Sequence, residues 1–144
     1  MINLFYKPYL YYNLYIRHKI QNKRSSYSQF QEDLFIDNFF RNKSRGFYID
    51  IGCYHPVKYS NTALLFNNGW SGINIDLNQT SIDLFNIARK RDKNICAALS
   101  NKDESSEFYF DHLLSPVNTL NKEFSDLSYK KISRNKYIKK SVRK

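Results

Sequence analysis

The spacing of apolar and polar positions between residues 28 and 110 predicts helices and strands in alternation. Ser28 and Gln31 have the spacing of a capping box, and apolar positions then recur at helical intervals until Gly46, so we expect one amphipathic helix here. Its inward stripe is predicted to consist of Phe30, Leu34, Phe35 and Phe39. Residues 47–51 are too uniformly apolar for a strand with one buried face, which indicates a central parallel strand.

The later elements are expected at residues 61–68 (helix), 72–76 (strand), 80–88 (helix) and 94–99 (strand). Thr80 or Ser81 would cap the helix at 80–88. Strands that alternate with helices are typical of βαβ units with right-handed crossovers. The sequence therefore predicts an α/β fold with a doubly wound parallel sheet.

The pattern weakens toward the end of the chain. Residues 107–110 are predicted to be a further strand that extends or flanks the sheet, and residues 111–124 a loop. Residues 125–144 hold scattered apolar positions among many Lys and Arg, so we expect a weak helix or a disordered tail.

The net charge of +10 lies at the two ends of the chain. Residues 1–24 carry +5, residues 25–111 carry −2 and residues 112–144 carry +7. A nucleic-acid groove needs its cations on a folded face, so no specific nucleic-acid partner is expected. We divide the chain into a basic and aromatic arm (1–24), an incomplete Rossmann-like domain (25–124) and a basic tail (125–144).

The arm combines tyrosines with lysines and arginines, which suits weak contact with a membrane surface. The alternative is an arm that packs on the domain or a frayed terminus. A length of 144 residues allows one buried core, and a mean hydropathy of −0.63 without a long apolar run excludes a spanning helix. With two distant cysteines and no secretory leader, we expect a cytoplasmic protein, peripheral at the membrane if the arm binds there.

Two carboxylates fall where a parallel sheet binds its ligands. Asp50 lies near the end of the first strand, before Gly52, and Asp76 closes the second strand. Gly52 and Asp76 are 24 residues apart, near the roughly 20 expected for a carboxylate that binds ribose hydroxyls. Tyr54 and Val57 occupy the places of the glycines that a pyrophosphate needs, which favours a nucleoside without phosphates, above all S-adenosylmethionine. An acid that caps a turn in an unrelated α/β fold is the alternative.

A longer set of motifs adds to this interpretation. In chain order they are SQFQEDLFID (28–37), FYIDIG (47–52), His55-Pro56, Ser60-Asn61-Thr62, GWSGINID (69–76) and AALS (97–100). Together they resemble the FkbM family of S-adenosylmethionine-dependent methyltransferases, from about Ser26 to about Phe124. The resemblance implies a Rossmann-like methyltransferase fold and methyl transfer to a hydroxyl, often on a sugar or a polyketide-like product. It also implies that Asp50, Gly52, Cys53 and Asp76 bind the cofactor.

The chain departs from the family pattern in three places. Cys53 stands where alanine is common, and Leu77-Asn78 follow Asp76 where alanine or glutamate with Asn-Pro is usual. The family domain also continues through further strands, and nothing after Phe124 matches them. The resemblance therefore implies a truncated domain whose first strand is an edge, covered by the basic tail, completed by a second subunit as a homo-oligomer, or left open in a truncated product.

Other residues have two interpretations each. His55 is a weak candidate for the catalytic base, or a turn residue before Pro56. Asn61 and Thr62 would cap a helix or contact the cofactor carboxylate. Cys53 and Cys96 are expected to be small buried residues, and no metal is predicted. Glu32 and Asp33 are expected to be solvated charges, and the family resemblance offers a role toward cofactor or acceptor as the alternative. Two further assignments are Trp70 as a packing anchor, and Arg89, Lys90 and Arg91 as cations that complement a helix end.

The predicted function is methyl transfer from S-adenosylmethionine to a hydroxyl of a carbohydrate or related small molecule. One alternative is a catalytically inactive remnant of such an enzyme. The other is a basic protein that binds a membrane surface or nucleic acid through its ends.

Overall fold

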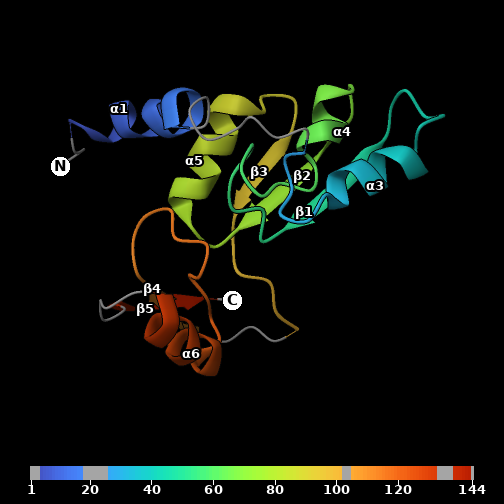
Figure 1. Ribbon diagram of the computed structural model, residues 1–144. Helices are drawn as coiled ribbons and strands as arrows, with labels where there is room; N and C mark the ends of the chain where they lie inside the picture. The colour runs from blue at the N-terminus through green and yellow to red at the C-terminus, as the bar shows by residue number, and fades with distance from the viewer. Residues whose placement is uncertain (1–3, 18–25, 102–104, 133–137, 144) are drawn as a thin grey trace. The chain divides into compact units, whose positions relative to one another are not determined.

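The computed structural model describes residues 4–17, 26–101, 105–132 and 138–143 (Figure 1). Tertiary contacts divide the chain into two compact units, Met1–Cys96 and Ala97–Lys144. This boundary differs from the one predicted at residue 124, because the strand near residue 107 pairs within the second unit. Each unit is described by itself.

The first unit is built on a three-stranded parallel sheet. Its strands are β1 (Phe47–Ile51), β2 (Ser71–Asp76) and β3 (Lys93–Cys96), in the order β1-β2-β3. Helix α4 (Ala63–Asn67) connects β1 to β2, and α5 (Gln79–Ala88) connects β2 to β3. The α/β class and the positions of these three strands are confirmed.

The helices cover one face of this sheet, so the predicted doubly wound arrangement is wrong. Tyr48 is buried with Leu65 of α4 and Trp70, while Phe47, Ile49 and Ile51 on the opposite face are 62%, 59% and 64% exposed. The strand order makes β1 an edge strand. The central position predicted from its apolar run is therefore wrong, and the edge position that the family resemblance implied is confirmed. The physical reason is the strand order, since right-handed crossovers that always step in the same direction place their helices on the same face.

Helix α3 (Glu32–Phe39) confirms the first predicted helix but not its inward stripe. Phe30, Phe35 and Phe39 are each more than 70% exposed, whereas Ile36 and Phe40 pack against the core around Tyr48. The predicted capping by Ser28 and Gln31 is also wrong. The partner of Ser28 is Asp33, which is fully buried and therefore not a solvated charge.

Asp33 orients α3 because its carboxylate forms hydrogen bonds with the segment before the helix. It accepts hydrogen bonds from the Ser26 and Ser28 hydroxyls at 2.5 and 2.7 Å and from the Tyr27 backbone N–H at 2.7 Å. Burial by itself raises the pKa of Asp33, but these hydrogen bonds outweigh it and leave the pKa below its usual value.

The arm begins with helix α1 (Tyr6–Tyr11) and the π-helical turn η1 (Tyr12–Ile16). The Tyr6 hydroxyl donates to the Asp83 carboxylate of α5 at 2.6 Å, so the arm packs on α5 within the first unit. The remainder of the predicted arm, residues 1–3 and 18–24, lies outside the described residues. Among the described residues, no helix combines the length and the apolar character that crossing a bilayer requires.

The second unit holds β4 (Ser105–Phe110), α6 (Lys122–Ile132) and β5 (Ile138–Arg143). Strand β4 pairs antiparallel with β5 in a separate two-stranded sheet and does not extend the parallel one. For residues 125–144 the predicted helix is confirmed over the part that α6 covers, and the alternative of a disordered tail is wrong for the described residues, where α6 and β5 lie. The long separation of β4 from β5 explains the error, because no local pattern encodes their pairing.

Candidate functional site

The site forms where the chain leaves β1, in residues 52–54, which we call the β1 turn. Gly52 has φ of 71°, a left-handed conformation that glycine adopts without steric cost. A Cβ added at Gly52 would meet no atom within 4 Å, so the backbone there leaves room for a ligand. The N–H groups of Gly52 and Cys53 donate to the Ile75 carbonyl of β2 at 2.8 and 3.2 Å.

Asp76 binds this turn directly. Its Oδ2 accepts a hydrogen bond from the Tyr54 backbone N–H at 2.8 Å, and its Oδ1 accepts one from the Asn78 N–H at 2.7 Å. Asn78 in turn caps α5 by accepting from the Thr80 N–H, a role predicted for Thr80 or Ser81. The turn glycine and the distant aspartate thus converge at the carboxyl ends of adjacent parallel strands, as predicted.

Asp50 lies on the same face of the sheet as Asp76. It is opposite Asn74 in the register of β1 and β2, two positions before Asp76. The Thr62 hydroxyl donates to Asp50 Oδ2 at 2.6 Å, so Thr62 stands at the N-cap of α4 without capping it through its side chain.

Both carboxyl groups of this pair have raised pKa values. Burial is the main cause of the raised pKa of Asp50, partly offset by the Thr62 hydrogen bond and the charge of Arg89. Burial is also the main cause for Asp76, and the nearby negative charge of Asp50 raises its pKa further. Two carboxylates this close form a negative site that favours hydrogen-bond donors such as hydroxyls.

Two other predicted cofactor residues have different surroundings. The Cys53 side chain is 3% exposed and packs with Ile82 and Phe85, so only its backbone faces the turn. Burial raises the pKa of the Cys53 thiol, as do the charges of the two nearby aspartates. Asn61 is exposed and lies before the N-cap Thr62, outside helix α4, which begins two residues later than predicted.

His55 serves as a turn residue. It is 2% exposed, and its Nδ1 accepts hydrogen bonds from the backbone N–H groups of Val57 and Lys58 at 3.1 and 3.0 Å. A neutral imidazole whose Nδ1 accepts hydrogen bonds carries its proton on Nε2, so neither nitrogen is free to remove a proton from a substrate hydroxyl. This contact supports the turn interpretation of His55 over that of a catalytic base.

Arg89 has a role at the site that the sequence did not reveal, because we expected it to complement the dipole at the end of α5. It is 1% exposed and reaches back into the loop after the β1 turn. Its Nη1 donates to the Thr62 hydroxyl at 2.7 Å, and its Nη2 donates to the Pro56 carbonyl and the Ser60 hydroxyl at 2.6 and 2.8 Å. Through Thr62, Arg89 also fixes the position of the Asp50 carboxylate.

The site combines two carboxyl groups that accept hydrogen bonds with an open backbone at Gly52. Within the described ranges, no three His, Cys, Asp or Glu side chains lie close enough together to hold a metal ion. The three-stranded parallel sheet with helices on one face is compatible with a Rossmann-like fold. In comparisons with known proteins, no family model, no curated protein and no solved structure matches the chain.

Proposed function

We propose that this protein binds S-adenosylmethionine at the β1 turn and transfers its methyl group to a hydroxyl of a sugar or related small molecule. The observation that carries the proposal is the convergence of Gly52, Asp50 and Asp76 at the carboxyl ends of two adjacent parallel strands. The resemblance to FkbM methyltransferases supports the same ligand.

The residues present fit such a ligand. Asp76 keeps acceptor capacity beside its two backbone hydrogen bonds and would receive the ribose hydroxyls. The open space at Gly52 would admit the nucleoside against the backbone. When bound, S-adenosylmethionine supplies an electrophilic methyl group on sulfur, so the protein mainly has to hold and orient the two reactants.

Isothermal titration calorimetry with S-adenosylmethionine tests the binding step. We expect heat of binding with the unmodified chain and its loss in Asp76→Asn. The matched control is Asp37→Asn, which removes an acid from α3 that accepts a hydrogen bond from Asn68. Thermal melting of both variants separates loss of the site from loss of the fold, and equal binding by a folded Asp76→Asn chain would contradict the proposal.

The raised pKa of Asp76 predicts how the affinity for S-adenosylmethionine changes with pH. The ionised carboxylate is the better acceptor for ribose hydroxyls, so affinity is expected to fall as the pH drops through this raised pKa, above the usual value of 3.8. Asp76→Asn should flatten this dependence wherever residual binding is measurable.

A second candidate is a protein that binds the methyl donor without transferring the methyl group. The observation in its favour is His55, whose Nδ1 is occupied by two backbone N–H groups instead of facing an acceptor. Incubation with methyl-labelled S-adenosylmethionine and a panel of sugars separates the candidates. Labelled sugar supports the transferase, whereas binding without labelled product supports the donor-binding protein.

A further inference from the structure

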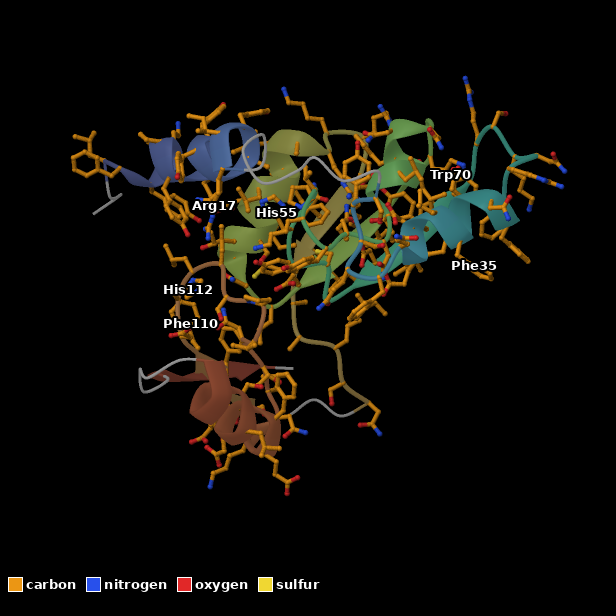
Figure 2. The ribbon with its side chains drawn as sticks, viewed as in Figure 1. Arg17, Phe35, His55, Trp70, Phe110 and His112 are labelled. Carbon is orange, nitrogen blue, oxygen red and sulfur yellow. The ribbon has the colours of Figure 1, made fainter. Side chains whose placement is uncertain are left out.

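Two cations lie beside the β1 turn without a carboxylate partner among the residues that the structure describes. The Lys58 Nζ lies 4.8 Å from the centroid of the Tyr59 ring. Arg17, at the end of η1, donates to the Oδ1 of buried Asn13 at 3.3 Å. Arg17 is near enough to lower the pKa of Lys58, after burial, which is the larger cause. In Figure 2 the labelled Arg17 lies near the labelled His55, which belongs to the same loop as Lys58.

The sequence around Arg17 offers these cations no negative charge. The first acidic residue of the chain is Glu32, so the whole arm lacks carboxylates. Holding two cations close together costs free energy in the protein without a ligand, because like charges repel and the half-buried ammonium group has lost part of its hydration. An anion placed between them would remove this cost.

Two tyrosines complete the cluster. The rings of Tyr54 and Tyr59 stack with centroids 6.3 Å apart and planes 21° from parallel. Both residues have a left-handed backbone conformation, with φ of 54° and 56°, which residues other than glycine rarely adopt. Such conformations persist where the surroundings enforce them and are concentrated at binding sites. Here the hydrogen bond from the Tyr54 N–H to Asp76 holds the first of them in place.

We propose that Arg17 and Lys58, together with the Tyr54 and Tyr59 rings, form a subsite for the carboxylate or phosphate group of a small molecule bound at the β1 turn. This inference rests on the proposed function for the identity of the neighbouring site. A guanidinium binds such groups through two parallel hydrogen bonds, and an ammonium adds a second charge. The tyrosine rings offer an apolar surface to the remainder of the molecule. The anionic group would come from the methionine part of S-adenosylmethionine or from the acceptor.

The probe is inorganic phosphate, titrated into the full chain by calorimetry. We expect Lys58→Met and Arg17→Met each to weaken phosphate binding about tenfold, the loss of one charge-assisted hydrogen bond. The matched control is Lys43→Met, because the Lys43 Nζ likewise lies over a ring, 5.6 Å from the centroid of Phe40, and its removal changes the net charge equally. Absence of phosphate binding, or equal binding by the Lys58→Met and Lys43→Met chains, would overturn the inference.

Two further titrations identify the source of the anion. Phosphate that competes with S-adenosylmethionine assigns the subsite to the donor carboxylate, whereas simultaneous binding assigns it to the acceptor; both results support the subsite. Methylthioadenosine, which lacks the carboxylate, tests the neighbouring site alone. If it binds and phosphate does not, the subsite is wrong and the proposed function stands. If phosphate binds and neither nucleoside does, the proposed function is wrong and the anion site stands.

Discussion

Replacing Arg89 with methionine is expected to destabilise the first unit strongly, although Arg89 belongs to a run of basic residues. The guanidinium makes three hydrogen bonds of 2.6 to 2.8 Å inside the protein. Hydrogen bonds to a charged group contribute about 1.5–3 kcal/mol each, but the removal also relieves the cost of burying the charge. The Ser60 and Thr62 hydroxyls can turn toward each other, 3.4 Å apart, which leaves the Pro56 carbonyl without its donor.

We therefore expect a net loss of about 3 kcal/mol in the free energy of unfolding, or a fall in melting temperature on the order of 10 °C. Urea unfolding followed by the fluorescence of Trp70, the single tryptophan and 6% exposed in the first unit, measures this loss. Lys90→Met is the matched control, because Lys90 is the exposed neighbour of Arg89. If the two variants unfold at the same urea concentration, the role assigned to Arg89 is wrong.

Two shorter predictions concern residues whose burial differs from the sequence expectation. Asp33→Asn should lower the free energy of unfolding by about 1–2 kcal/mol at pH 7. Burial raises the pKa of Asp33 but its hydrogen bonds lower it more, so the stability that the carboxylate contributes is lost as the pH falls from 3.8 through the folded pKa. In urea unfolding, the difference in stability between the variant and the unmodified chain should therefore be smaller at pH 3 than at pH 7. Ile49→Lys should lower the free energy of unfolding by less than about 0.5 kcal/mol, because Ile49 is 59% exposed. Ile82→Lys should lower it several times more in the same assay, because Ile82 is 2% exposed. Equal losses would show that the outward face of β1 is covered.

The position of β1 could be predicted, but its place in the sheet could not. Gly46 and Gly52 bound the apolar run, which fixes where the strand begins and ends. An apolar run does not tell which neighbour covers each face, because Phe47, Ile49 and Ile51 have the same character whether helices lie over them or not. The face is decided by strand order, which depends on contacts far apart in the sequence.

The first helix shows the same limit within one element. Apolar residues occupy two stripes of α3, and helical spacing alone does not select between them. The choice follows from Asp33, whose hydrogen bonds to the preceding segment turn Ile36 toward the core and leave Phe35 exposed. Acidic residues are normally solvated, but Asp33 is buried. The sequence pattern therefore predicts the helix but not which of its faces is directed toward the core.

The candidate site was predictable where topology alone determines it. Parallel strands end at the same edge of a sheet, so Asp50 and Asp76 had to converge once both strands were assigned. Arg89 was not predictable, because an arginine at the end of a helix is normally solvated and its acceptors lie 27 to 33 residues earlier in the chain. Only the folded loop after the β1 turn brings them to it.

The exposed apolar side chains of β1 take no part in the hydrogen bonds that hold the candidate site. The β1 turn is held by hydrogen bonds to Ile75 and Asp76, and these residues belong to β2 within the same unit. The exposed side chains of β1 point away from the helices that surround Asp50 and Thr62. A partner that covered the outward face would therefore raise the stability of the sheet by burying apolar surface, at about 25 cal/mol per Å². It would not have to build the β1 turn, because the hydrogen bonds from this turn to Ile75 and Asp76 are already made within the first unit.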